Sequence, residues 1–116
     1  MAEPVDGSAF DRGHVVWHEG LFRGSSRPWL VLSDDRHPFH GREYLVAGIT
    51  TTERDAAIAL PDDAWAVGGL PRPSYASPWF LTTLEHARID RGVGALAADV
   101  TDRIVTEAAR YLGAVE

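Results

Sequence analysis

The fold is decided by residues 29–33, which read Trp29-Leu30-Val31-Leu32-Ser33 and directly follow Pro28. A continuous apolar run of this length predicts a strand that is buried on both faces. Similar segments precede and follow it: residues 13–17 (Gly-His-Val-Val-Trp) and residues 44–51 (Tyr-Leu-Val-Ala-Gly-Ile-Thr-Thr) are rich in strand-forming side chains. Gly48, inside the third segment, predicts a bend or the close approach of another group. We therefore expect three consecutive strands in the first half of the chain.

Loops rich in Gly, Ser, Asp, His and Pro connect these strands, at residues 19–27 and 34–41. In the second half, the glycines and prolines of residues 68–78 predict irregular structure rather than helix. The remaining strands are expected at residues 57–60, 78–84 and 87–89.

One helix is expected, at the C-terminal end. Asp99 is its predicted N-cap, with Asp102 three residues later as a variant of the capping box. Gly113 predicts its end. Apolar side chains recur at helical spacing and predict a face turned to the core: Val100, Ile104, Ala108 and Leu112. Five or more short strands followed by one helix predict a mainly β, α+β fold, in which a small barrel is closed by the helix.

Length and composition favour a single soluble domain. The chain has 116 residues, of which 45% are hydrophobic and 24% charged, and it has no cysteine. No apolar run approaches the roughly 18 residues that span a bilayer. Residues 1–11 carry three acids and no basic side chain, unlike a secretory signal. We expect a flexible acidic tail at residues 1–12, one domain at residues 13–116, and a cytoplasmic protein without membrane association.

The charge of the chain argues against broad, nonspecific binding of nucleic acid. The formal net charge is −6, and all eleven basic residues are arginines. The arginines are concentrated in residues 12–54, which hold six of them against five acids. Local binding of a phosphate is therefore compatible with the acidic composition, because a guanidinium pairs well with phosphate oxygens.

Several segments together resemble toxins of the MazF/PemK family. The resemblance is carried, in order, by residues 13–17, the Arg23-Gly24-Ser25-Ser26-Arg27-Pro28 loop, residues 29–33, Val46-Ala47-Gly48-Ile49-Thr50, residues 77–84 and Ala87-Arg88-Ile89-Asp90. It implies an SH3-like barrel that forms a homodimer. It also implies a toxin of a type II toxin–antitoxin system, an endoribonuclease that cuts single-stranded mRNA and is held inactive by a cognate antitoxin. Toxin–antitoxin complexes of this kind also bind DNA.

Two residues match the catalytic positions of that family, Arg27 in the Arg-Pro pair and Thr50 in the Ile-Thr pair. Attack of a ribose 2′-hydroxyl on the adjacent phosphorus builds negative charge, which a guanidinium can stabilise without a metal. A threonine hydroxyl can donate to a phosphate oxygen or orient the attacking hydroxyl. The resemblance thus implies a reaction with no cofactor, catalysed by Arg27 and Thr50.

Weaker candidates for substrate contacts lie near these two in the sequence: His18, Arg23, Ser25, Ser26 and Thr51. His18 is a candidate base or RNA contact, because histidine titrates near neutrality. His37 and His40 are three residues apart but lack a third ligand in sequence, so no metal site is expected. His14 and His86 are expected to be structural or solvated.

The four tryptophans are candidates for stacking on RNA bases, but structural roles are expected for them. Trp17 and Trp29 lie in apolar strands and are assigned to the core, whereas Trp65 and Trp79 are assigned to a barrel cover or a dimer interface.

Residues 80–84 (Phe-Leu-Thr-Thr-Leu) carry no charge, whereas some family members place an Arg and an Asp on the corresponding strand. Two alternatives therefore stay open. One is a binding toxin of the same fold that poisons gyrase without catalysis. The other is a family member that has lost its activity.

Overall fold

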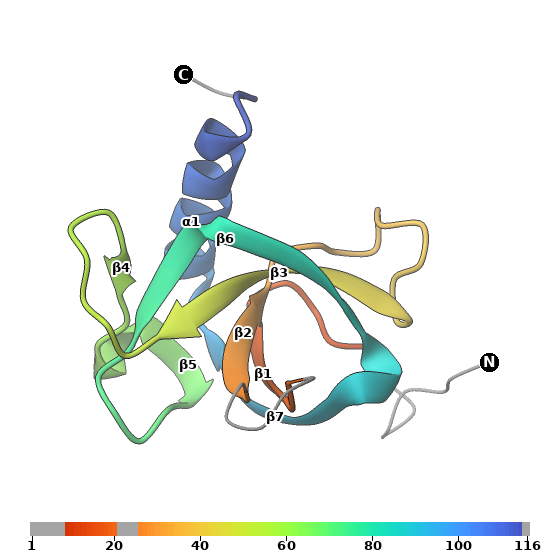
Figure 1. The fold of residues 1–116 in the computed structure, drawn as a ribbon, viewed down its shortest axis with the longest axis horizontal. Helices are drawn as coiled ribbons and strands as arrows, with labels where there is room; N and C mark the ends of the chain where they lie inside the picture. The colour runs from red at the N-terminus through yellow and green to blue at the C-terminus, as the bar shows by residue number, and fades with distance from the viewer. Residues whose placement is uncertain (1–8, 21–25, 115–116) are drawn as a thin grey trace.

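The computed structural model describes residues 9–20 and 26–114 of the chain. Figure 1 shows the strands curling into a half-barrel, with the helix α1 standing at one end of it. Within the described residues the strands form one seven-stranded sheet in the order β4-β6-β3-β2-β1-β7-β5, paired antiparallel throughout. The elements are β1 (His14–His18), β2 (Arg27–Val31), β3 (Glu43–Thr50), β4 (Ile58–Ala59), η1 (Asp62–Ala64), β5 (Trp65–Gly68), β6 (Tyr75–Glu85), η2 (His86–Arg88), β7 (Ile89–Leu96) and α1 (Ala98–Tyr111). The predicted mainly β fold with a C-terminal helix is confirmed.

The strand β2 is buried on both faces, as its apolar run predicted. Leu30 is fully buried and belongs to the cluster that packs beneath α1, together with Ile104. Trp29 and Val31 point to the opposite side of the sheet and join a second cluster around Tyr44. Because side chains alternate along a strand, one continuous apolar segment supplies both halves of the core.

The pairing of β3 with β6 is interrupted next to Gly48. Ala47 pairs with Leu81, but Gly48 pairs with Ser77, so residues 78–80 of β6 loop out of the ladder. The Phe80 ring packs against Gly48, where a Cβ atom would lie 2.6 Å from the ring. The predicted close approach at Gly48 is therefore confirmed, and the bulge explains how a proline is tolerated inside β6.

The C-terminal half contains more strand than the sequence predicted. Residues 68–78 were expected to be irregular, but β5 ends at Gly68 and β6 begins at Tyr75. The last strand, expected at residues 87–89, begins at Ile89 and runs to Leu96, while His86–Arg88 forms a 3-10 turn. Glycines permit this pairing, because a Cβ atom on Gly68, at φ +66°, would collide with the Val93 carbonyl oxygen.

The helix α1 also differs from its prediction at both ends. Its N-cap is Ala97, without a side-chain hydrogen bond, so the assignment of Asp99 as the cap is wrong. Asp99 instead lies in the first turn, where a carboxylate is stabilised by the helix dipole. Ile104 and Ala108 are buried as predicted, whereas Leu112 forms the C-cap and is 72% exposed. Gly113 at φ +79° ends the helix as expected.

Residues near the N-terminus contact the barrel. The backbone N–H of Phe10 donates to the Tyr44 hydroxyl at 3.1 Å, and the Phe10 ring lies 5.3 Å from that of the fully buried His86. The hydroxyl of Tyr44 in turn lies 2.7 Å from His86 Nδ1. A flexible tail was predicted at residues 1–12, but Phe10 packs against the barrel. Residues 1–8 lie outside the described residues, so for them the flexible tail stays a prediction. Within residues 9–20 and 26–114, no helix is long and apolar enough to cross a membrane.

Candidate functional site

A pocket of about 500 Å³ opens at the ends of β1, β2 and β3, and we call it the main pocket. It is lined by Trp17, Ser26, Arg27, Pro28, Ile49, Thr50, Thr51, Leu70, Pro71, Arg72 and Ser74. Sheet pairing creates it, because β2 begins at Arg27 and β3 ends at Thr50 on neighbouring strands. Four residues that the sequence singled out thus line one pocket: Ser26, Arg27, Thr50 and Thr51.

The Arg27 side chain rests on two aromatic rings. Its guanidinium carbon lies 5.7 Å from the centre of the Trp29 ring and 5.2 Å from that of Phe80. The two rings lie 5.3 Å apart, and Phe80 is itself held against Gly48. Both rings attract the cation and limit the positions that it takes, while its N–H groups can still donate to phosphate oxygens.

The Thr50 hydroxyl is oriented by the backbone. Its Oγ1 accepts a hydrogen bond of 3.1 Å from the backbone N–H of Thr52. Accepting this bond uses a lone pair of the oxygen, so the hydroxyl hydrogen can still be donated to a ligand in the main pocket. Thr51 follows as an exposed residue at the same edge.

The other predicted substrate contacts are not among the described residues that line the main pocket. His18 is half-buried and lies opposite Arg27 in the pairing of β1 with β2, but it does not line the main pocket. Arg23 and Ser25 lie outside the described residues. Trp17, which was assigned to the core, is only partly buried and lines the main pocket, whereas Trp29 is in the core as expected.

Arg72 is a residue of the main pocket that sequence reasoning missed. It lies between Pro71 and Pro73 in a segment that was predicted only as irregular. Its carbonyl oxygen accepts a hydrogen bond of 2.8 Å from the hydroxyl of the buried Ser74, and the Ser74 carbonyl accepts one of 2.9 Å from Leu60 N–H. In the sequence Arg72 is marked only by the proline on each side of it, and this pattern does not indicate which part of the fold the arginine lies against.

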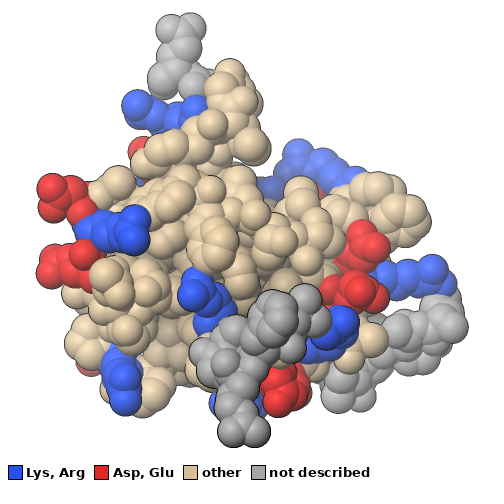
Figure 2. Space-filling view, in the orientation of Figure 1, with Lys and Arg blue, Asp and Glu red and all other residues tan. Residues whose placement is uncertain are grey.

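The main pocket is locally positive although the chain is acidic. Among its lining residues there are two arginines, Arg27 and Arg72, and no Asp or Glu. Figure 2 shows basic and acidic side chains interspersed over one face, with a wide uncharged area between them. An anionic ligand in the main pocket therefore meets cations without a neighbouring carboxylate, which suits a phosphate.

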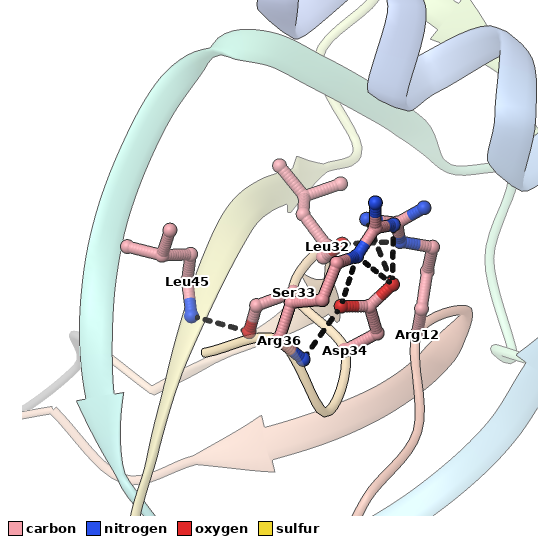
Figure 3. Close-up of polar contacts among 6 residues, drawn as sticks. All are labelled: Arg12, Leu32, Ser33, Asp34, Arg36 and Leu45. Atoms are coloured by element: carbon pink, nitrogen blue, oxygen red, sulfur yellow. Dashed lines mark hydrogen bonds and ion pairs between the residues drawn. The ribbon is translucent and has the colours of Figure 1, made fainter. Parts of the chain in front are cut away.

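Two other arginines are engaged elsewhere, by Asp34 (Figure 3). The Arg36 guanidinium lies 2.7 Å from the Asp34 carboxylate, and that of Arg12 lies 3.5 Å from it. Hydrogen bonds from the Arg36 side chain and backbone, with the charge of Arg12, hold the pKa of Asp34 well below its usual range. The same contact raises the pKa of Arg36. Arg12 also donates through Nε to the Leu32 carbonyl at 2.6 Å, so this cluster ties the chain before β1 to the end of β2.

The histidines of residues 34–41 make local contacts. Nδ1 of His37 accepts a hydrogen bond of 3.0 Å from Phe39 N–H, and the His40 ring lies 5.8 Å from that of Tyr44. Among the described residues, no three His, Cys, Asp or Glu side chains come together in a group that could hold a metal ion.

Comparison with known proteins identifies the family. The family model of PemK-like, MazF-like toxins of type II toxin–antitoxin systems matches residues 11–112. No curated protein sequence matches the chain significantly.

Solved structures share the fold. A mycobacterial endoribonuclease in complex with its cognate antitoxin superposes with a TM-score of 0.72 at 22% identity, over 94% of this chain and 98% of that chain. MazF in a MazE–MazF structure from Deinococcus radiodurans gives 0.70 at 21% identity, over 93% and 99%. The Mycobacterium tuberculosis toxin MazF-mt6 gives 0.63 at 26% identity, over 87% and 99%. Because the family model spans nearly the whole described barrel and helix, this chain belongs to the PemK-like, MazF-like family of type II toxin–antitoxin toxins.

Proposed function

We propose that this toxin is an endoribonuclease that cleaves single-stranded mRNA without a metal, through attack of a ribose 2′-hydroxyl on the adjacent phosphorus. The observation that carries the proposal is the main pocket, in which Arg27 and Thr50 meet at the ends of neighbouring strands beside a second arginine. Solved structures of mycobacterial endoribonucleases, which share the fold, support it.

In this reaction the 2′-oxygen forms a bond to phosphorus while the bond from phosphorus to the 5′-oxygen breaks. The products are a 2′,3′-cyclic phosphate and a 5′-hydroxyl, and the proton lost by the 2′-hydroxyl is balanced by the one gained at the 5′-oxygen. The phosphorane that forms on the way carries extra negative charge on its non-bridging oxygens. Contacts of the Arg27 guanidinium with the Trp29 and Phe80 rings support the proposal that Arg27 stabilises that charge, because a cation oriented in advance costs little reorganisation.

Thr50 has the supporting role. Its hydroxyl, fixed through the bond from Thr52 N–H, donates to a phosphate oxygen or holds the attacking 2′-hydroxyl. Ser26 and Thr51 contact the substrate at the rim of the main pocket. Arg23 and Ser25, which lie outside the described residues, stay predicted substrate contacts. His18 is a further candidate for a contact, from its position opposite Arg27.

We also propose that the protein acts as a homodimer and binds a cognate antitoxin. Relatives solved with an antitoxin support the second part. Exposed apolar side chains support both, because Leu45 at 48% and Leu112 at 72% exposure line one pocket together with Leu81 and Val105, and a continuous exposed apolar surface marks a protein contact.

The experiment is cleavage of mixed single-stranded RNA by the purified protein in excess chelator, at low and at high salt. Wild type should cleave and leave 2′,3′-cyclic phosphate ends, which mass spectrometry identifies. Arg27→Ala should lose at least 100-fold in rate, the scale of removing one preorganised donor. The control is Arg103→Ala, which removes the same charge from an exposed position of α1.

Absence of cleavage by wild type at any salt would contradict the proposal. The uncharged residues 80–84 of β6 would then favour a toxin that binds gyrase without catalysis, or a family member without activity. Cleavage that requires a divalent ion would contradict the metal-free mechanism alone.

A further inference from the structure

A second pocket, of about 590 Å³, adjoins the main pocket, and we call it the adjoining pocket. Four residues line both pockets: Leu70, Pro71, Arg72 and Ser74. Trp65 and Tyr75 line only the adjoining pocket. The segment from Leu70 to Ser74 therefore forms the ridge between the two, and Arg72 is the charged side chain on that ridge.

From this arrangement we infer that the adjoining pocket binds a nucleotide that flanks the cleavage site. We infer also that Arg72 binds the phosphate next to the scissile one, which joins this flanking nucleotide to the nucleotide in the main pocket. The inference rests on the proposed ribonuclease function and adds to it a second subsite with a named phosphate contact.

The position of the two pockets fits a continuous strand of RNA. Thr50, which lines the main pocket, pairs directly with Tyr75, which lines the adjoining pocket. Paired strands lie about 5 Å apart, so the pockets are separated by a single strand spacing plus the ridge. Consecutive nucleotides of one RNA strand can therefore occupy the two pockets.

Arg72 is held for this task by its neighbours. Pro71 and Pro73 each fix one backbone dihedral on either side of it, and its carbonyl is anchored by the Ser74 hydroxyl. The Arg72 side chain itself is exposed, so a phosphate can reach it without a change in packing. Among the described residues no salt bridge involves Arg72, so its guanidinium can bind a phosphate through charge-assisted hydrogen bonds.

Aromatic residues of the adjoining pocket are candidates for contacts with the base of the flanking nucleotide. Trp65 and Tyr75 are both partly buried, and both line the adjoining pocket. Bases of single-stranded nucleic acid stack on such rings without strict sequence preference. One carboxylate, Asp62, also lines this pocket, and it disfavours a phosphate there while leaving an uncharged base unaffected.

The first test measures the phosphate contact. A short RNA that wild type cleaves is made uncleavable by a 2′-deoxy substitution at the attacking ribose. The phosphate on either side of the scissile one is then replaced, one at a time, by a neutral methylphosphonate. Wild type should bind one of the two modified RNAs about tenfold more weakly than the unmodified RNA, the scale of one charge-assisted hydrogen bond.

The same RNAs are then bound to Arg72→Ala. This variant should bind the unmodified RNA about tenfold more weakly than wild type, and neutralising the sensitive phosphate should change its affinity less than twofold. Arg103→Ala should behave as wild type with every RNA. The inference is overturned if the methylphosphonate penalty is the same in wild type and Arg72→Ala, or if Arg72→Ala binds as tightly as Arg103→Ala.

The second test measures the base subsite. The RNA is lengthened by one nucleotide on the side of the phosphate whose neutralisation weakens binding. This added nucleotide should raise kcat/KM of wild type about tenfold, the scale of one stacked base. In Tyr75→Val, which keeps a strand-forming side chain, that gain should fall at least threefold while cleavage of the shorter RNA is retained. An unchanged gain would overturn the base subsite. Failure of wild type to cleave any RNA would instead contradict the ribonuclease function itself, and this inference with it.

Discussion

The guanidinium carbon of Arg27 lies 5.2 Å from the centre of the Phe80 ring, and that ring packs in turn on the backbone of Gly48. The stack joins three strands, because Arg27 opens β2, Gly48 belongs to β3 and Phe80 to the bulge of β6. The contacts of the proposed catalytic side chain therefore include a bulge whose residues do not line the main pocket.

Replacing Phe80 with leucine should slow cleavage about two- to fivefold, because a partly exposed cation–π contact is worth about 0.5–1 kcal/mol. The loss should appear in kcat rather than in KM, since the ring contacts Arg27 and does not line the main pocket. Single-turnover cleavage rates measure it. Phe39→Leu is the matched control, because Phe39 is 54% exposed and its ring lies near His37, outside the main pocket. Equal losses in the two variants would contradict the positioning role.

Gly48→Ala should reproduce the defect of Phe80→Leu by displacing the same ring. A Cβ atom at this position would lie 2.6 Å from the Phe80 ring, so the ring must move. Thermal unfolding should show destabilisation of about 1–3 kcal/mol, the usual cost of overpacking.

A double-mutant cycle separates this effect from a general loss of stability. If Gly48→Ala acts on activity through Phe80, combining it with Phe80→Leu should add little to the rate defect of either change. Additive rate defects would show that the two residues act on the site independently.

The sequence predicted the strands that make the main pocket better than the segment that completes it. The core strands β1, β2 and β3 follow from apolar segments long enough to need burial, and their order places the start of β2 beside the end of β3. Arg72, in contrast, lies in a segment whose prolines and glycines specify turns but not which surface they cross. Its position depends on the long-range pairing of β6 with β3, which no local pattern encodes.

Errors at the ends of elements have a similar cause. Asp99 had the chemistry of an N-cap, but the helix begins one residue before it because Leu96 and Ala97 are tied by backbone hydrogen bonds to Gly13 and Ala64. The strand β7 was predicted too short because Gly92 and Gly94 weaken a strand pattern. In the fold these glycines allow close contacts, with Phe10 and with β5. Tertiary pairing overrode local preference in both cases.

Asp34→Asn should make the protein less stable near neutral pH and change little in acid. Hydrogen bonds from Arg36 depress the pKa of Asp34 in the folded state, so the ionised carboxylate stabilises the fold above its unfolded pKa of about 3.9. That contribution is lost as the pH falls below about 4, toward the depressed folded-state value. The difference in unfolding midpoint between wild type and Asp34→Asn should therefore be largest near pH 7, small because the cluster is exposed to solvent, and smaller still in high salt.

The control for this prediction is Asp35→Asn, which removes the neighbouring, exposed carboxylate. Its midpoint should follow wild type from pH 7 to pH 3. If both variants lower the midpoint equally, the effect comes from the net charge of the chain and not from the contact of Asp34 with Arg36.

Thr50→Val tests whether the hydroxyl at the end of β3 takes part in the reaction. Valine has nearly the same shape and a strong preference for strands, so β3 and its pairing with Tyr75 should be kept. Loss of the hydroxyl removes the acceptor for Thr52 N–H, which lies in an exposed turn where water replaces it at little cost in stability. The rate of cleavage should nevertheless fall at least tenfold, because one hydrogen bond to the reacting phosphate or to the 2′-hydroxyl is lost.

Thr50→Ser, which restores a hydroxyl without the methyl group, should recover most of the rate. Recovery by serine at an unchanged unfolding midpoint separates a chemical role from a structural one, whereas equal rates in the valine and serine variants would remove Thr50 from the mechanism.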